Sequence, residues 1–260
     1  MSTKNRRTLL CLVVATAIGT TILQPASAAG DDAGQILKAM SDYLTSQKTI
    51  SATYNSDIEV ITPDLQKIQF NSSGALLINR PDQIRASRIG GYSDIQMLFD
   101  GKTLSVYGRN INRYFQMDFA GSIEKLIETQ GEHFVSIPGA DLLLPDVYEK
   151  LMARVIDAKH IGLGVINNFE CEHLAFRTQD TDWQLWVQKG RNPIPRKLVI
   201  TSKSIGAAPQ YTLVISDWKT DVPADPTAFV FKVPVGASKM LLQELKNLDE
   251  LPSGAPAKGQ

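Results

Sequence analysis

Three consecutive residues, Gly101-Lys102-Thr103, match the last three positions of a phosphate-binding loop. Such a loop also requires a glycine five residues before the Gly-Lys pair, and Gln96 occupies that position. The flanking residues alternate between apolar and polar, which is typical of two strands joined by a turn. A phosphate-binding loop instead leads from a strand into a helix. We therefore interpret Asp100-Gly101 as a hairpin turn without phosphate chemistry.

A second pair of reactive side chains is Cys171 and His173, two residues apart on a predicted strand. Residues at this spacing share one face of a strand, so the two could supply two ligands to zinc. The other histidines, His133 and His160, have no ligand-like spacing around them. Without a second pair we predict no metal site and no cofactor. The favoured interpretation of Cys171 is a small buried thiol beside a half-exposed histidine.

Hydrolytic chemistry has little support in the sequence. The chain has neither a Gly-x-Ser-x-Gly nucleophile turn nor a His-Glu-x-x-His zinc motif. Asp180 and Asp182 fall near a predicted turn, where solvated carboxylates are common. Catalytic triads need no sequence motif, so a hydrolase stays as an alternative. We expect a protein that is not an enzyme.

The N-terminus has the three parts of a secretory signal peptide. Lys4, Arg6 and Arg7 precede an apolar run over 9–23, and Ala26-Ser27-Ala28 offers small residues to a signal peptidase. The run is short and contains threonines, which argues against a permanent membrane anchor. We expect cleavage near Ala28, export to the periplasm, and no membrane span in the mature chain.

Removal of residues 1–28 leaves 24 basic and 27 acidic residues, a net charge near −3. The acidic balance and the lack of a basic cluster exclude nucleic acid as an expected partner. Only Cys171 remains, so no internal disulfide can form. The fold must therefore depend on its hydrophobic core.

The remaining chain changes period along its length. A helix that Asp31 or Asp32 could cap is indicated by apolar residues at helical spacing, namely Ala33, Ile36, Leu37, Met40 and Leu44. Two blocks of alternating residues then predict about five and about six strands. The first block runs from 54 to 119 and the second from 183 to 233. Residues 122–153, between the blocks, predict two helical stretches.

These elements predict an α+β fold that is mainly β. We expect a single curved antiparallel sheet, an incomplete β-barrel of about 11 strands, with helices covering its concave apolar face. Residues 29–240 are assigned to this one domain, and 241–260 to a short helix and a flexible tail. A sheet closed by helices instead of by its own edges predicts an apolar cavity.

Several stretches carry a resemblance to a known fold. They are Ser51-Ala52-Thr53-Tyr54, the hairpin over 99–107, the run Cys171-Glu172-His173-Leu174-Ala175-Phe176 with the strands after it, and the closing segment over 229–234. The chain resembles the LolA/LolB-type periplasmic lipoprotein carriers, and more closely a family of predicted periplasmic proteins of that fold with no established activity.

The resemblance implies a half-barrel that carries helices as a lid over an apolar cavity. The carriers of this fold bind acyl chains, and related modules act as envelope-stress sensors. LolA-type carriers hold the lid closed with an arginine, for which Arg85, Arg88 and Arg109 are candidates here.

We expect the protein to bind an apolar ligand, such as a lipid or a lipoprotein acyl chain, as a carrier or chaperone. The alternative is an envelope sensor or adaptor that docks a partner protein at an exposed apolar patch or sheet edge. The residues expected to line the cavity are Tyr54, Ile58, Phe70, Leu104, Met117 and Trp183.

Overall fold

The fold was obtained as a computed structural model that describes residues 28–133, 140–248 and 251. The predicted signal peptide before Ala28 lies outside these residues, as do parts of the predicted tail. The chain begins with α1 (Ala28–Ser46) and continues into six strands: β1 (Thr49–Ile61), β2 (Lys67–Asn79), β3 (Gln83–Gly90), β4 (Asp94–Phe99), β5 (Thr103–Gly108) and β6 (Arg113–Asp118).

Three helical elements separate these strands from the rest of the sheet. They are α2 (Ile123–His133), the 3-10 helix η1 (Ala140–Leu143) and α3 (Val147–Met152). The second block of strands is β7 (Asp157–Ile166), β8 (Phe169–Arg177), β9 (Thr181–Gln188), β10 (Pro195–Ser202) and β11 (Gln210–Thr220). The chain then forms η2 (Pro226–Phe229), the two-residue β12 (Ser238–Lys239) and η3 (Leu242–Asn247).

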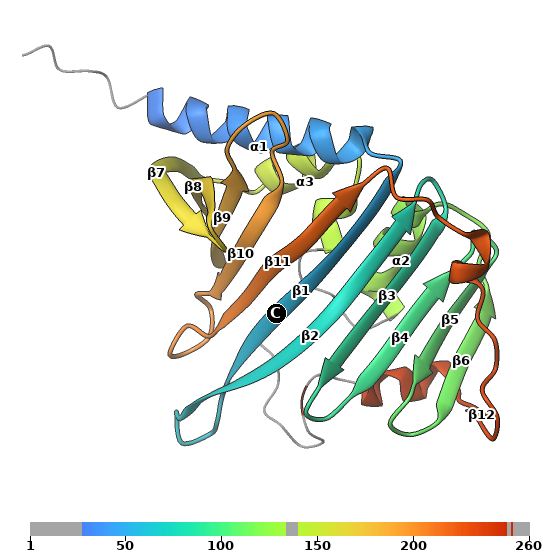
Figure 1. Cartoon of the computed structure of the whole chain (residues 1–260). Coiled ribbons are helices and arrows are strands. Elements are labelled where there is room, and N and C mark those ends of the chain that lie inside the picture. Colours follow the sequence, from blue (N-terminus) through green and yellow to red (C-terminus); the bar gives the residue numbers. More distant parts are fainter. Residues whose placement is uncertain (1–27, 134–139, 249–250, 252–260) are drawn as a thin grey trace, which may run out of the picture.

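All strands of the described residues belong to one open sheet, which confirms the predicted architecture. The order is β12-β6-β5-β4-β3-β2-β1-β11-β10-β9-β8-β7, so β12 and β7 stand at opposite edges. Every neighbouring pair is antiparallel except β12 with β6. Figure 1 shows the sheet with α1 along one end and with α2 and α3 behind it.

The concave face of the sheet carries the core. One buried cluster joins α1, η1 and α3 to β1 and β8–β11, with Leu37, Met40, Val147 and Leu185 among its members. A second cluster joins α2 to β2–β5 through residues such as Ile123, Leu126, Ile78 and Phe99. Because apolar and polar residues alternate along the strands, every second residue is apolar and points to this face. The helices must therefore shield this face from water.

The C-terminal segment wraps around the β6 edge. On the outer face Phe231 packs against Tyr107 and Tyr114, which lie opposite each other on β5 and β6. After β12, Leu245 of η3 and Leu248, which follows η3, pack with Phe115 on the concave face. The segment therefore covers both faces at this edge and protects it from pairing with other strands.

The described residues form twelve strands, which agrees with the prediction of about eleven: the first block has six, the second has five and β12 adds one. Two other expectations need correction. The alternation over 229–233 does not form a central strand. Phe229 is the last residue of η2, and the residues after it cross the outer face, where Phe231 packs on Tyr107 and Tyr114 without pairing to a strand. The first helix begins at Ala28, so neither Asp31 nor Asp32 caps it.

A close approach at Gly74 fixes one part of the concave face. Tyr54 lies over Gly74, and its hydroxyl donates to the Ser87 carbonyl at 3.0 Å. A Cβ on Gly74 would overlap both the Tyr54 ring and the Ser87 carbonyl. Only glycine lets the ring lie flat across β2.

We therefore expect Gly74→Ala to lower the free energy of unfolding by about 2 kcal/mol, the cost of overpacking a filled site. Urea denaturation followed by tryptophan fluorescence measures this change. Gly91→Ala is the matched control, because a Cβ there meets no atom within 4 Å, and its effect should stay below about 0.5 kcal/mol. Equal stability of the two variants would contradict the packing described here.

Candidate functional site

The six residues predicted to line a cavity all lie on the concave face. Trp183 stands opposite Ile200, Ile200 opposite Tyr211, and Tyr211 opposite Ile58. Ile58 in turn stands opposite Phe70. The register thus aligns three of the predicted residues in one apolar row that crosses five strands.

The other three residues lie elsewhere on the same face. Leu104 stands opposite Met117, and both belong to the cluster under α2. Tyr54 lies between the two groups, over Gly74. The structure therefore divides the predicted set into a row whose Trp183 end lies under α1 and α3, a pair under α2, and one tyrosine between them.

Burial shows how these side chains are used. Leu104 is only 1% exposed, and Trp183 is 7% exposed and stacks on Phe176. Ile58 and Phe70 are half-buried, and Phe70 makes an edge contact with Tyr92. The row is thus covered most completely at its Trp183 end, where the helices pack on it.

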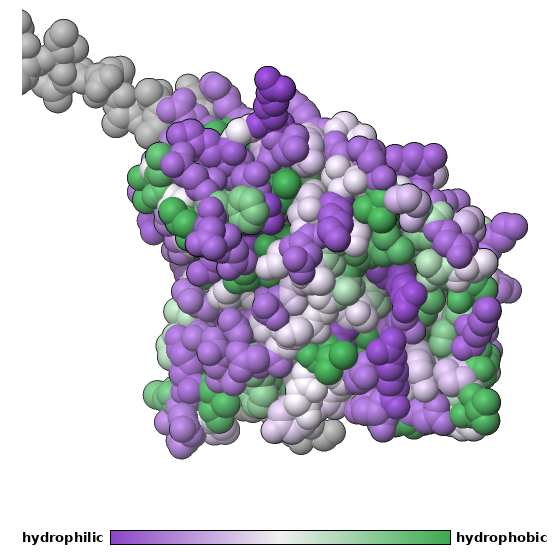
Figure 2. Space-filling model, in the orientation of Figure 1, coloured by the Kyte–Doolittle hydropathy of each residue, from purple (hydrophilic) through white to green (hydrophobic). Residues whose placement is uncertain are grey.

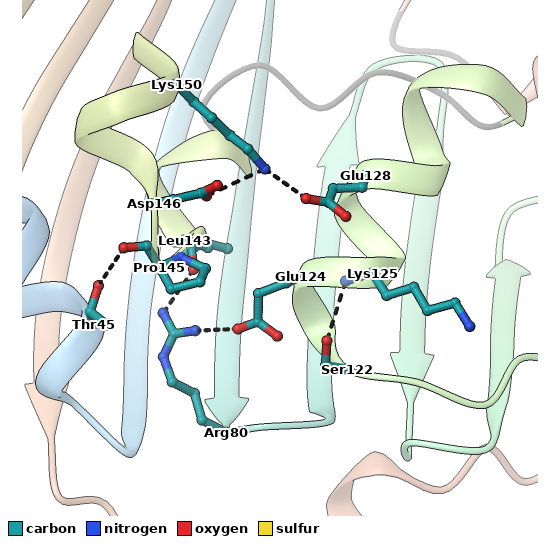
Figure 3. Close-up of polar contacts among 10 residues, drawn as sticks. All are labelled: Thr45, Arg80, Ser122, Glu124, Lys125, Glu128, Leu143, Pro145, Asp146 and Lys150. Atoms are coloured by element: carbon teal, nitrogen blue, oxygen red, sulfur yellow. Dashed lines mark hydrogen bonds and ion pairs between the residues drawn. The ribbon is translucent and has the colours of Figure 1, made fainter. Parts of the chain in front are cut away.

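Polar contacts connect the helices over the concave face to the sheet (Figure 3). Arg80, in the β2–β3 turn, donates to the Glu124 carboxylate of α2 at 3.1 Å and to the Leu143 carbonyl of η1 at 2.8 Å. Lys150 of α3 lies 2.7 Å from the Glu128 carboxylate of α2. These contacts join three helical elements that are adjacent in sequence, which we call the helix cover, α2–η1–α3.

Burial of the Arg80 guanidinium lowers its pKa from the ordinary value, and the Glu124 carboxylate opposes that shift. Arg85, Arg88 and Arg109 were the arginines considered from the sequence. Arg85 is exposed on β3, Arg88 donates to the Leu248 carbonyl, and Arg109 lies 3.6 Å from Asp94. The arginine found bridging the sheet and the helix cover is Arg80, which no motif distinguished.

A groove of about 390 Å³ lies between α1 and the end of the sheet near the β9–β10 turn. Its apolar lining comes from Ile36, Ala39 and Tyr43 of α1 and from Val187 of β9. Glu172 of β8 also lines it and is held by His160 at 2.8 Å. The volume falls within the range of small-ligand sites, about 300–1,000 Å³.

Sequence analysis did not predict this groove. A signal was present, because 36, 39 and 43 form a second apolar stripe on α1 beside the buried stripe of Leu37, Met40 and Leu44. The β9–β10 turn that completes the groove comes from far along the chain, so only the tertiary structure reveals it.

Cys171 and His173 share the outer face of β8, as predicted. The His173 ring stacks on Trp186 with ring centroids 4.1 Å apart and pairs with the Gln184 amide oxygen. The Cys171 thiol is buried, and burial raises its pKa. Within the described part of the chain, no three His, Cys, Asp or Glu side chains are grouped as metal ligands.

Gly101-Lys102-Thr103 forms the predicted hairpin turn between β4 and β5. Gly101 has a φ of +87°, and the Asp100 carboxylate accepts from the backbone amides of Lys102 and Thr103. A strand follows, not a helix, so the segment has no phosphate-binding geometry.

Residues 33–242 match the family model described as "Predicted periplasmic protein (DUF2092)", and the chain belongs to that family. This confirms the resemblance found in the sequence. None of the helices in the described residues is both long and apolar enough to cross a membrane. The search of curated proteins found no match.

Several solved structures are similar to the chain at low identity. An uncharacterized conserved protein from Thermus thermophilus is 12% identical with a TM-score of 0.46, over 80% of this chain and 98% of that one. LprF from Mycobacterium bovis is 10% identical with a TM-score of 0.45, over 76% and 98%. A chain of the MucA/MucB complex of Pseudomonas aeruginosa is 9% identical with a TM-score of 0.43, over 77% and 61%.

The buried thiol leads to a chemical prediction. Because burial raises the pKa of Cys171, little reactive thiolate forms in the folded protein. We expect no labelling by a disulfide reagent at mildly alkaline pH, and complete labelling after unfolding in guanidinium. An Ile89→Cys variant, exposed on β3, is the positive control and should be labelled at once. Rapid labelling of native Cys171 would contradict its burial.

Arg80 gives a second prediction. Arg80→Met keeps the length of the side chain but removes the donors to Glu124 and to the Leu143 carbonyl. We expect a loss of about 2 kcal/mol in stability, the size typical of hydrogen bonds to charged groups. Hydrogen exchange should accelerate in α2 and η1 before it does in the strands.

Arg109→Met is the control for this variant, because its ion pair with Asp94 is longer and involves no residue of the helix cover. Unchanged exchange in α2 in the Arg80→Met protein would show that apolar packing alone holds the helix cover.

Proposed function

We propose that the protein is a periplasmic binding protein for an apolar ligand, such as a lipid or a lipoprotein acyl chain. The observation that carries the proposal is the apolar row on the concave face, with Trp183 under the helices at one end and the half-buried Phe70 at the other. The ligand would lie between this row and the helix cover. The residues proposed to contact it are Tyr54, Ile58, Phe70, Leu104, Met117 and Trp183.

The contact between sheet and helices suits exchange with such a ligand. Apolar side chains such as Leu126 and Val147 cover the sheet, and an acyl chain could replace them without exposing a polar group. The polar attachment through Arg80 lies at the end of the strands, away from the row. Opening about this end would separate the two apolar layers while the sheet keeps its register.

The groove beside α1 supports the same proposal. It places the apolar side chains of Ile36 and Tyr43 next to Val187, which belongs to the same buried cluster as Trp183. A ligand that enters from this side would therefore pass from the groove onto the concave face. Residues 1–28 are proposed to direct export, with cleavage near Ala28, in keeping with the family description.

The two tryptophans of β9 provide a sharp test, because they point to opposite faces of the sheet. Trp183 lies in the concave core and Trp186 stacks on His173 outside it. Single-tryptophan proteins can be made as Trp186→Phe/Trp218→Phe and as Trp183→Phe/Trp218→Phe. Each is stripped of lipid and titrated with a dibrominated stearic acid, whose bromines quench a nearby indole.

We expect saturable quenching of Trp183, reversed by unbrominated stearic acid, and no quenching of Trp186. Native mass spectrometry of protein purified from periplasm should show an acyl species bound at one copy per chain. Equal quenching of both tryptophans, or no uptake by either protein, would refute ligand binding on the concave face.

A second candidate function is an adaptor that docks a partner protein, as the sequence also suggested. The observation that favours it is the exposed apolar edge at β7, where Leu163 and Val165 stand in solvent. Its prediction is a periplasmic complex that survives the loss of lipid binding.

A further inference from the structure

The two edges of the sheet differ in how they are protected. The β6 edge is covered by β12 and the C-terminal segment. At the other edge β7 is the last strand, with α1 packed against it. Within the described ranges, β8 is the only strand that pairs with β7. Alternate N–H and C=O groups of β7 therefore face away from the sheet without a strand partner.

The exposed half of β7 is also apolar. Leu163 is 58% exposed and Val165 is 69% exposed, and both lie on the same face as their neighbours Glu172 and Glu170 on β8. Figure 2 shows apolar surface beside the start of α1, in the region that β7 occupies in Figure 1. Residues 161–168 contain no charged residue and no proline, the usual protections of a free edge.

Local geometry limits the flat part of this edge to Gly162–Ile166. A bulge interrupts the register between His160 and Gly162, and Gly162 has a φ of +127°. Beyond the bulge, Gly164 lies beneath the Trp186 indole, which is 3.1 Å from the position that a Cβ would take. From Gly162 to Val165, the side chains of Leu163 and Val165 therefore lie on one face of the strand, while the glycines leave only backbone on the other face.

We propose that β7 pairs with β7 of a second copy of this chain, antiparallel, with Gly164 of one copy opposite Gly164 of the other. In this register Leu163 stands opposite Val165 of the second copy, and Val165 opposite Leu163. Four apolar side chains become buried on one face. On the other face glycine meets glycine, and Ile166 of each copy lies opposite Gly162. The sheet then continues through both copies.

The chemistry of the strand favours a second copy over an unrelated segment, because the stretch is complementary to itself. Leu163 and Val165 face each other, and Ile166 finds the space left by Gly162, only when the same strand runs in the opposite direction.

The pairing is expected to be reversible. The flat stretch of Gly162–Ile166 is short, and the interface is smaller than the roughly 1,200 Å² at which stable complexes begin. Dimers should therefore increase with protein concentration. The pairing does not depend on the proposed ligand, so dimerisation and ligand binding can fail separately.

Sedimentation velocity of the mature protein over a range of concentrations tests the proposal. We expect a monomer–dimer equilibrium that Leu163→Lys/Val165→Lys weakens by more than about tenfold, since it brings like charges together across the edge. Ile89→Lys is the matched control, because Ile89 is 54% exposed on β3 and has strands on both sides. It should leave the equilibrium unchanged.

A cross-link fixes the register. In a Leu163→Cys/Val165→Cys protein, each new cysteine would face the other type across the interface at the distance that a disulfide needs. We expect a covalent dimer under mild oxidation, which the Ile89→Cys protein does not form. A chain that is monomeric at every concentration and gives no cross-link overturns the proposal, as does equal weakening by the Ile89→Lys change.

Discussion

The structure depends on the burial of one apolar face of an open sheet. Strand alternation gives every strand one apolar side, and the antiparallel register adds these sides into a continuous surface that includes Ile58, Tyr211 and Trp183. Such a surface cannot remain in water. In a closed barrel the strands would cover it themselves, whereas here α1, the helix cover and η3 do so. The placement of every helix over the sheet follows from this requirement.

The helix cover forms a layer over the sheet and is held there by two kinds of contact, apolar packing and polar bonds. The packing is apolar and not directional, so it tolerates replacement by a ligand of similar character. The attachment is polar and specific, through Arg80 to Glu124 and to the Leu143 carbonyl. The proposed binding of an apolar ligand would use this difference, because such a ligand could replace the apolar packing while the polar attachment stays in place.

The open form of the sheet also explains its edges. An open sheet has two free edges, and each presents unpaired backbone groups. The C-terminal segment covers one edge by passing from the outer face to the concave face, with Phe231 on one side and Leu248 on the other. At the other edge, α1 lies against β7, but within the described residues no strand pairs with the outer side of β7. The proposed pairing of two copies would satisfy that edge without adding any further segment of the chain.

The sequence by itself determined the class of fold and the faces of the strands. Period-two alternation placed Leu104 and Trp183 toward the core, and Asp100-Gly101 marked a turn, because these patterns act over a few residues. The prediction of a strand at 229–233 was wrong because alternation cannot distinguish a paired strand from a segment packed across a sheet. Only the tertiary structure decided that Arg80, and not Arg85, Arg88 or Arg109, reaches the helices. It also decided where α1 meets the β9–β10 turn to form the groove, because both depend on contacts between residues far apart in the chain.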